Sequence, residues 1–386
     1  MSRLDELFQE LCPNGVTYKK LVDAVSIERG KRVVRSQLST SGKYPVYQNS
    51  LTPLGYHTDC NYSANTTFII VAGAAGEIGF SDRAFWAADD CFAIVCPEGV
   101  LNRYVYHLLL NNQNQLLSKV RKASIPRLSR SAIENLVIPI PPLDVQREIV
   151  RILDNFTELT AELTVELTAR QKQYAFYRNK LLTFGKTEGA RIERIPLEDI
   201  GSICMCKRIL KSQTNTVGGV PFYKIGTFGK KADSYISQET FDEYRSKYNF
   251  PKKGDVLISA AGTIGRTVVY DGEPAYFQDS NIVWIDNDES VVLNSYLRYC
   301  YELKPWKASE GGTIPRLYND NIAKAVIAVP PIEEQKRVVS ILDRFDAICN
   351  DLTSGLPAEI EARQKQYEYY RDKLLSFKEH KNELSD

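Results

Sequence analysis

The sequence predicts an α+β protein in which two mixed α/β domains are joined by two long antiparallel coiled-coil helices with approximate internal two-fold symmetry. The first observation is a duplication, because SIPRL...IPIPPLDVQREIVRILDNF in residues 124–156 returns as TIPRL...IAVPPIEEQKRVVSILDRF in residues 313–345. The second is a matched block after each copy, ARQKQYAFYRNKLLTF in 169–184 and ARQKQYEYYRDKLLSF in 362–377. Self-similarity at a long fixed period indicates a duplicated architecture.

Two long helices follow from the spacing of apolar residues. Residues 144–183 hold no Gly or Pro, and their apolar residues recur every three, four or seven positions. This pattern predicts one amphipathic helix of about 40 residues, with Pro141 and Pro142 before it and Gly185 after it. Residues 333–376 repeat the pattern, but Gly355 and Pro357 predict a kink or short break. The helices bury their apolar stripes most economically against each other.

The rest of the chain divides into two variable domains of strands and short helices. The predicted boundaries are an N-terminal helical segment (1–13), a first domain (14–142), a first spacer helix (143–185), a second domain (186–331), a second spacer helix (332–377) and a polar tail (378–386). AAGEIG in 74–79 matches AAGTIG in 260–265, giving Gly76/Gly79 and Gly262/Gly265. Each segment predicts a tight turn between strands, because a phosphate loop needs a third glycine, a lysine and a following helix.

Composition places the chain among ordinary globular proteins. Its 386 residues are 43% hydrophobic and 25% charged, which is enough for two domains. No run of about 18 apolar residues occurs, and MSRLDELFQEL predicts an acidic amphipathic helix, not a signal peptide, so we expect a cytoplasmic protein without a membrane segment. The net charge is +1, but residues 14–140 hold 14 Lys and Arg against 9 Asp and Glu, so any basic surface is local.

No reaction centre is recognisable. The sequence lacks a loop ending in GK[ST], HExxH, GxSxG and the tetrapeptides of amino-methyltransferases, and its eight cysteines match no metal spacing, so we predict free buried thiols, no catalytic residue and no metal site. Of the three histidines, His107 and His380 are interpreted as structural or solvated, while His57 lies in a predicted loop that is placed to touch a ligand.

A tetrapeptide repeat, TEL-TAEL-TVEL-TAR, runs through residues 157–170. Each four-residue unit turns a helix by about 400° and lengthens it by about 6 Å, so a unit can be added or removed with a rotation of only about 40°. The segment is therefore interpreted as a ruler. The alternative is a solvated, Glu-rich coiled-coil face with no metric role.

These features together resemble a known family. Two variable domains, each closed by IPxPPxxxQxxIVxILDxF and RQKQYxxYRxxLLxF, resemble the specificity subunit of type I restriction-modification enzymes, and the tetrapeptide repeat resembles subclass IC of that family. One departure is Val145-Gln146 where the second copy has Glu334-Gln335. The resemblance implies that each domain is a target recognition domain reading one half of a bipartite, asymmetric DNA site, and that the helices set the spacer between the halves.

The resemblance also implies partners. They are double-stranded DNA, two modification subunits that dock on the helical regions and carry S-adenosylmethionine, and two restriction subunits that use ATP and Mg²⁺. This chain would then supply specificity without catalysis and bind no cofactor itself. Two other classes stay open from the residues alone: a methyltransferase or nuclease with an unrecognised motif, and a coiled-coil adaptor with no DNA role.

Candidate contact residues follow from charge and duplication. Phosphate contacts are expected from Lys and Arg, and base contacts from Arg, Lys, Asn and Gln. The duplicated basic positions are Lys31, Arg32, Lys207, Arg208, Arg127 and Arg316, the last two with an equal alternative role in bracing each domain against its helix. The unmatched candidates are Gln48, Asn49, His57, Lys224, Lys230 and Lys231. The candidates for partner docking, all in the matched helical blocks, are Gln146, Arg170, Tyr174, Gln335, Arg363 and Tyr367.

Overall fold

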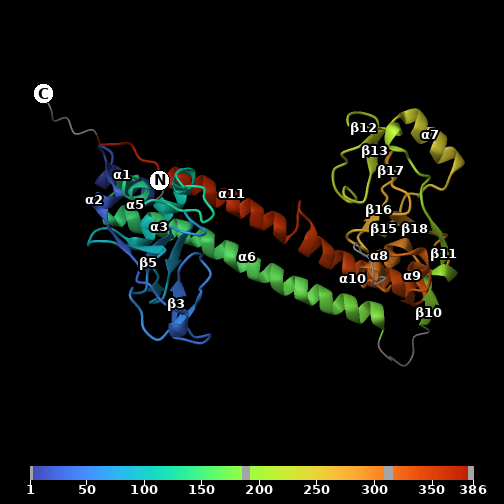
Figure 1. Cartoon of the computed structure of the whole chain (residues 1–386), viewed down its shortest axis with the longest axis horizontal. Helices are drawn as coiled ribbons and strands as arrows, with labels where there is room; N and C mark the ends of the chain where they lie inside the picture. The colour runs from blue at the N-terminus through green and yellow to red at the C-terminus, as the bar shows by residue number, and fades with distance from the viewer. Residues whose placement is uncertain (1–2, 185–191, 308–315, 381–386) are drawn as a thin grey trace. The chain divides into compact units, whose positions relative to one another are not determined.

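The protein is described by a computed structural model that covers residues 3–184, 192–307 and 316–380 (Figure 1). It forms two compact units: residues 1–165 with 359–386, and residues 166–358. The predicted fold class is confirmed, because both domains are mixed helix and sheet with a long helix between them. Each unit combines one globular domain with helical blocks from both sequence copies.

In the first unit, the globular domain is built on two small sheets. An antiparallel sheet has the order β2-β8-β5-β6, with β2 (Ser26–Arg29), β8 (Cys91–Val95), β5 (Thr66–Ile70) and β6 (Ile78–Ser81). A second sheet has the order β4-β3-β7, with β4 (Gly55–His57), β3 (Tyr44–Tyr47) and β7 (Trp86–Ala87), in which β3 and β7 are parallel. β1 (Thr17–Lys20) pairs with β9 (Val137–Ile140). The short helices are α1 (Arg3–Leu11), α2 (Leu21–Ala24), η1 (Arg35–Gln37), α3 (Asn102–Asn111), α4 (Gln113–Ser118) and α5 (Arg130–Glu134).

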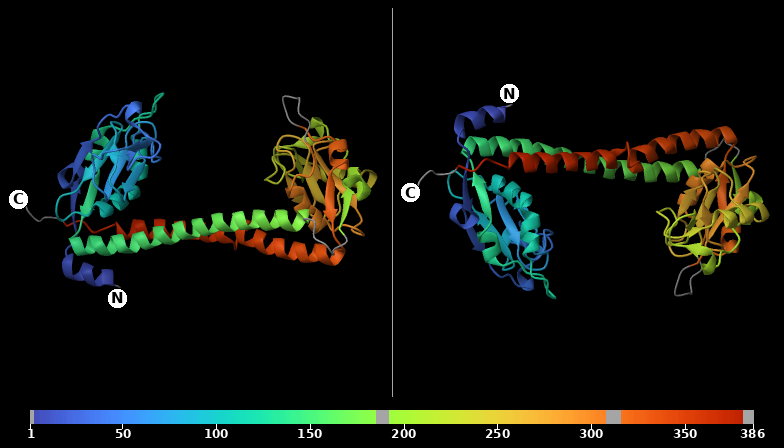
Figure 2. Two further views of the ribbon diagram at one scale, coloured as in Figure 1. Left: turned by 90° about the horizontal axis from the view of Figure 1, so that it is seen from below. Right: turned by 90° about the horizontal axis from the view of Figure 1, so that it is seen from above.

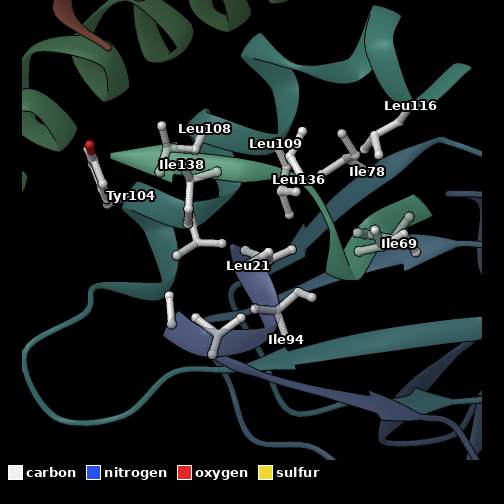
Figure 3. Close-up of a cluster of buried hydrophobic side chains, with 14 of the residues drawn as sticks. Leu21, Ile69, Ile78, Ile94, Tyr104, Leu108, Leu109, Leu116, Leu136 and Ile138 are labelled. Carbon is white, nitrogen blue, oxygen red and sulfur yellow. The ribbon is translucent and has the colours of Figure 1, made fainter. Parts of the chain in front are cut away.

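The core of this domain lies between the first sheet and α3. All five residues of β5 are buried, as expected for a central strand covered on both faces. Figure 3 shows apolar side chains from the sheet, from α3 and from β9 meeting in one cluster, among them Ile69, Ile94, Leu108 and Ile138. The same cluster includes Val145, Ile149 and Leu153 of the long helix. The domain and the start of that helix therefore share one core.

The second unit repeats the plan with additions. Its first sheet has the order β11-β18-β15-β16, with β11 (Gly201–Cys204), β18 (Ile282–Asn287), β15 (Val256–Ser259) and β16 (Thr267–Val269). Its second has the order β12-β14-β13-β17, with β12 (Thr214–Asn215), β14 (Tyr235–Ile236), β13 (Val220–Tyr223) and β17 (Tyr276–Phe277). β10 (Glu193–Pro196) pairs with β19 (Val326–Val329). The helices are η2 (Leu197–Asp199), η3 (Lys211–Gln213), α7 (Gln238–Lys247), α8 (Asn294–Glu302) and α9 (Asn319–Ala323).

The predicted long helices are confirmed. α6 (Leu143–Thr183) is one helix of 41 residues, and Gly185, predicted to end it, lies outside the described residues. The second copy forms α10 (Ile332–Asn350) and α11 (Leu356–Leu374) with a break between them. In the break, Asp351 accepts hydrogen bonds from the backbone of Thr353 and Ser354. Gly355 is required there, since a Cβ would lie 2.5 Å from the carbonyl oxygen of Ala347.

Within each unit, α6 packs antiparallel against one helix of the other copy (Figure 2). In the first unit, the ring of Tyr370 on α11 stacks on Phe156 of α6. In the second unit, Phe345 of α10 stacks on Tyr177 of α6. The ILDxF block of one copy therefore meets the RQKQY block of the other copy in both units.

The N-terminal segment packs beside the C-terminal helix. Phe8 of α1 meets Phe377 edge-on with ring centroids 5.5 Å apart, and Leu4 shares a cluster with Leu375. The backbone of Val16 then pairs with Glu379 in parallel. The two ends of the chain are thus joined in the first unit.

The turns after β5 and β15 correct one sequence match. Gly76 N donates to Ile70 O and Gly265 N donates to Ser259 O, so Gly76 corresponds to Gly265 and Gly73 to Gly262. All four have positive φ, between 67° and 93°. The predicted partner Gly79 instead lies in β6, where a Cβ would meet the Phe68 ring at 2.2 Å. The predicted tight turns are right, but the pairing of AAGEIG with AAGTIG is displaced by three residues.

Candidate nucleic-acid interface and helical contacts

A basic loop has the same local structure in both domains. GKRVVRSQ in 30–37 and CKRILKSQ in 206–213 each end in a 3-10 turn, η1 or η3. In η1 the Gln37 side chain accepts from Val34 N, and in η3 Gln213 accepts from Leu210 N, both at 2.9 Å. The loop side chains that carry positive charge are all exposed: Lys31, Arg32, Arg35, Lys207, Arg208 and Lys211. Arg35 and Lys211 were missed, although extending the KR match by three residues would have found them.

In the first domain, the structure brings Lys31 and His57 to the same tryptophan. Trp86 Nε1 donates to the backbone oxygen of Lys31 at 2.8 Å, and its ring centroid lies 4.4 Å from that of His57. His57 is the last residue of strand β4, so the prediction that it lies in a loop is wrong, although the strand ends there. Its Nδ1 lies 2.9 Å from Asp59 N and 3.1 Å from Asp59 O, so the imidazole is held against the backbone two residues further on.

Three further candidates gather at the glycine turn of this domain. Gln48 and Asn49 directly follow β3, and Asn49 O accepts from Ala74 N at 3.0 Å. A Cβ on Gly73 would lie 2.9 Å from the Cβ of Asn49, so this close approach requires glycine. The backbone of Arg127 pairs with Ala72 in the same turn, while its side chain is exposed. Arg127 thus ties the segment before α5 to the turn and still presents its charge to solvent.

In the second domain, Arg208 and Arg316 meet two consecutive residues. Arg208 Nε donates to Asp279 Oδ2 at 3.0 Å, and an Arg316 guanidinium nitrogen lies 3.4 Å from Ser280 Oγ. The backbone of Arg316 pairs with Ala261, as Arg127 pairs with Ala72. Lys207 holds its ammonium 5.2 Å from the centre of the Tyr248 ring. Arg208 and Arg316 therefore converge on adjacent residues, while Lys207 lies over Tyr248.

The unmatched lysines lie beside this group. Ile225 N donates to the side chain of Gln278, which sets Lys224 next to the segment that holds Asp279. Lys224 forms an exposed ion pair with Asp233 at 2.9 Å, while Lys230 and Lys231 are exposed. Lys230 also borders a cavity of about 310 Å³ lined by Tyr223, Phe277 and Tyr270.

Gln146 and Gln335 join each domain to its helix. Gln146 Oε1 accepts from Leu101 N at 2.9 Å, and its Nε2 donates to the carbonyl oxygens of Gly99 and Pro141. Gln335 makes the same three bonds, to Leu293 N, Val291 O and Pro330 O. Both side chains are fully buried. Both glutamines were predicted as partner-docking residues, but their burial leaves neither side chain accessible to a partner, and their bonds join the domain to its helix.

A second attachment lies two turns further along α6. The buried His107 of α3 places Nε2 2.8 Å from Asp154 Oδ1, and its Nδ1 lies 3.2 Å from the Tyr367 hydroxyl. A carboxylate only accepts, so Nε2 is the donor. Burial lowers the pKa of His107 and raises that of Tyr367 to about 12. Burial would raise the pKa of Asp154, but hydrogen bonds from His107 and Arg103 lower it overall. His107 is structural, as predicted.

The matched position in the second unit is Tyr299, whose hydroxyl donates to Asp343. There, Tyr174 donates to Glu302 Oε2 at 3.0 Å, and Arg178 pairs with the same carboxylate. Tyr174 is buried, and desolvation raises its pKa. Tyr174 and Tyr367 therefore attach the RQKQY block of one copy to the domain of the other copy.

The exposed helical residues are of two kinds. Arg170 contacts Glu166 and Gln173, and Arg363 contacts Glu359 and Gln366, so both arginines lie along their own helix. Beside them are two aromatic side chains at matched positions that sequence reasoning missed. Phe176 is 61% exposed and lies edge-on to Tyr177 with ring centroids 5.4 Å apart; Tyr369 is 62% exposed and meets Tyr370 in the same way at 5.4 Å.

The family follows from comparison with known proteins. The model described as the type I restriction modification DNA specificity domain matches residues 13–170 and 191–362. The chain belongs to this family. A putative type I restriction enzyme specificity subunit of Haemophilus influenzae is 48% identical over 378 residues, which are 94% of this chain and 96% of the relative. The EcoR124I/EcoR124II specificity subunit of Escherichia coli is 33% identical over 303 residues, 72% of this chain and 71% of the relative.

Solved structures of type I specificity subunits have the same fold. The S subunit of a type I restriction-modification system from M. genitalium has a TM-score of 0.64 at 14% identity, covering 93% of this chain and 96% of that one. A chain from a structure of type I complex assembly and conformational transition has a TM-score of 0.60 at 18% identity, covering 95% and 98%. At sequence identities this low, the similarity shows that the fold is shared and nothing more.

The specificity-subunit family is generally non-catalytic. In residues 3–184, 192–307 and 316–380, no group of three or more His, Cys, Asp or Glu side chains could hold a metal ion. No helix in the same ranges is long and apolar enough to cross a membrane. The eight cysteines are free, as predicted, but only Cys91, Cys206, Cys300 and Cys349 are buried.

Proposed function

We propose that this chain is the non-catalytic DNA specificity subunit of a type I restriction-modification enzyme. Each globular domain reads one half of a bipartite, asymmetric DNA site, and the helices set the length of the spacer. The observation that carries this proposal is a comparison of the two domains. Both have the same basic loop, in residues 30–37 and 206–213, but different residues lie next to it. The backbone of Lys31 contacts Trp86, whose ring lies against His57. In the second domain, Lys207 lies over the Tyr248 ring and Arg208 contacts Asp279.

This arrangement suits two domains that bind the same DNA backbone but read different bases. The loop cations are exposed in both domains, which favours contact with phosphates in any sequence. The neighbouring residues differ in their donors and acceptors, which favours different base contacts. The chain itself binds no cofactor in this proposal, and S-adenosylmethionine, ATP and Mg²⁺ belong to its partner subunits. It acts in the cytoplasm, where the duplex DNA and those subunits meet.

The partners are two modification subunits and two restriction subunits. Support for two identical docking sites comes from two equivalent aromatic groups. In the first unit, Tyr369 and Tyr370 lie beside Phe156, and in the second, Phe176 and Tyr177 lie beside Phe345. Each group combines both copies and exposes one ring by more than 60%. Large exposed aromatic side chains are common anchors in protein interfaces, and two equal anchors suit two copies of one modification subunit.

A domain exchange tests the recognition proposal. Residues 14–140 are replaced by those of a relative with a different target, and methylated sites are mapped in a host that expresses the chimera with its modification subunit. One half-site changes and the other stays, because the exchanged domain reads only its own half. A change in both half-sites, or in neither, contradicts the proposal. Methyl transfer from labelled S-adenosylmethionine by this chain alone would show an enzyme instead.

The docking proposal has its own experiment. Phe176→Ser and Tyr369→Ser are expected to weaken binding of the modification subunit by about tenfold per site, as for interface anchors. Binding is measured by titration calorimetry, which also gives the stoichiometry. Leu352→Ser is the control, since Leu352 is 76% exposed in the break between α10 and α11. Equal affinities for all variants, or one modification subunit per chain, would contradict two aromatic docking sites.

A further inference from the structure

The loop of residues 119–127 in the first domain concentrates positive charge. Arg121 N donates to Arg127 O at 2.8 Å and Arg127 N donates to Arg121 O at 3.1 Å, so the two ends of the loop are paired. The sequence KVRKASIPR carries Lys119, Arg121, Lys122 and Arg127 and no acidic residue. All four cations are exposed, and none forms an ion pair with a described carboxylate. Figure 2 shows this teal loop projecting from its domain.

The base of the loop is held by the glycine turn. Gly73 N donates to Pro126 O at 3.1 Å, and Leu128 N donates to Val71 O at 2.9 Å. Leu128 itself is buried, which anchors the chain as it leaves the loop. The same turn contacts Asn49, one of the candidates for reading bases. The loop therefore projects from a fixed base beside the candidate recognition residues.

The tip of the loop exposes one large apolar side chain beside Ser124. Ile125 is 53% exposed and stands between Lys122 and Arg127 in sequence, followed by the conformationally restricted Pro126. A single exposed apolar residue is ordinary on a protein surface. An exposed apolar side chain flanked by cations without a counter-charge suits a duplex, because phosphates meet the cations while the apolar side chain contacts base edges or steps.

We propose that the 119–127 loop enters a groove of the DNA that the first domain reads, with its cations on the phosphates and Ile125 against the bases. This inference rests on the proposed function and adds a contact element to it. The cations supply affinity for any sequence, and Ile125 contributes to the choice of the half-site. The second copy repeats KAS and IPR within residues 307–316 with Glu310 between them, and residues 308–315 lie outside the described part of the chain, so the proposal is limited to the first half-site.

The charge part is tested on the complex with modification subunits by measuring DNA affinity against salt. The variant Arg121→Gln/Lys122→Gln is compared with Lys19→Gln/Lys20→Gln, which removes two exposed cations from β1 of the same domain. The loop variant lowers the slope of log K against log salt by about 2, since each phosphate contact contributes about 0.9. It does so on target and non-target duplexes alike. A slope equal to that of the wild type overturns the proposal.

The tip is tested by Ile125→Ala against Val137→Ala, which has the same 53% exposure but lies in β9. The loop variant weakens binding of the target duplex by about tenfold, a usual value for a buried aliphatic contact, and keeps the wild-type salt slope. With 2-aminopurine placed along the first half-site, it also loses the fluorescence change at one or two positions. Wild-type affinity together with wild-type fluorescence overturns the role of Ile125. If the wild-type complex binds no duplex, the proposed function fails, and the loop proposal fails with it.

Discussion

Tyr370 of the second sequence copy stacks on Phe156 of the first, with ring centroids 5.3 Å apart and planes at 18°. Tyr177 of the first copy stacks on Phe345 of the second at 5.8 Å and 25°. The same two sequence positions therefore form a stacked pair twice, and each pair takes one ring from each copy. Such stacked pairs contribute about 1 kcal/mol beyond their burial, so both units depend on both copies for part of their stability.

We predict that Tyr370→Ala destabilises only the first unit. Loss of the stack and of apolar burial lowers its stability by about 2–4 kcal/mol. Hydrogen exchange followed by mass spectrometry is expected to show faster exchange in residues 3–165 and unchanged exchange in residues 192–307. A double-mutant cycle with Phe156→Ala gives a coupling of about 1 kcal/mol. The idea fails if protection changes equally in both units.

We also predict that Gln146→Ala costs about 2–4 kcal/mol of the stability of the first unit. The substitution leaves the N–H of Leu101 and the carbonyls of Gly99 and Pro141 without their bonds. Gln335→Ala has the same effect on the second unit, measured by thermal unfolding. Gln173→Ala on the same helix serves as the control, since the Gln173 side chain accepts a hydrogen bond from the exposed Arg170. A melting temperature that falls no more for Gln146→Ala than for this control would show that the three hydrogen bonds of Gln146 do not stabilise the unit.

The first unit should lose stability in mild acid. Burial lowers the pKa of His107, so the folded state binds a proton less readily than the unfolded chain. The stabilising contribution is therefore complete above the usual histidine pKa of about 6.5 and is lost as the pH falls below it. We predict that the melting temperature of the first unit falls between about pH 7 and pH 5.

His107→Tyr removes this dependence, because the matched Tyr299 already contacts Asp343 in the second unit without titrating in this range. Unfolding is followed by calorimetry at several pH values, with hydrogen exchange to assign the transitions. Identical pH profiles for the wild type and His107→Tyr would rule out His107 as the origin.

Deleting residues 164–167 is expected to shorten the recognised spacer and leave both half-sites intact. α6 is continuous through the tetrapeptide repeat, and Thr160 and Thr164 each bond the carbonyl oxygen four residues earlier. The deletion removes about 6 Å and rotates the rest by about 40°, which corresponds to about one or two base pairs. Methylation mapping measures the spacer. Changing Glu162 and Glu166 to Gln, which keeps the length, is the control, and an unchanged spacer after the deletion would contradict the ruler.

The long helices and their break could be predicted because their signals are local and periodic. Apolar spacing defines α6, and Gly355 with Pro357 marks the gap before α11. Leu159, Leu163 and Leu167 are half-buried along this helix, while Glu158, Glu162 and Glu166 are exposed, as the tetrapeptide predicts. The glycine match was misplaced because AGAAG offers two similar alignments, and only φ and hydrogen bonding distinguish them.

The contact residues were harder to predict for physical reasons. A residue that occurs in both sequence copies can be either buried or exposed, and the sequence does not say which. The buried Gln146 and Gln335 therefore could not be distinguished from surface residues such as Arg170. The meeting of Arg208 and Arg316 at Asp279 and Ser280 depends on tertiary packing. Phe176 and Tyr369 were missed because an aromatic residue in an amphipathic helix is usually assigned to its buried face.

The exchange of helical blocks between the copies also bears on ancestry. Each unit takes its domain and ILDxF block from one copy and its RQKQY block from the other. A single copy would have the composition of a swapped-dimer subunit, whose missing element is supplied by a second molecule. In this chain the second molecule is covalently attached, so assembly of the two units does not depend on concentration.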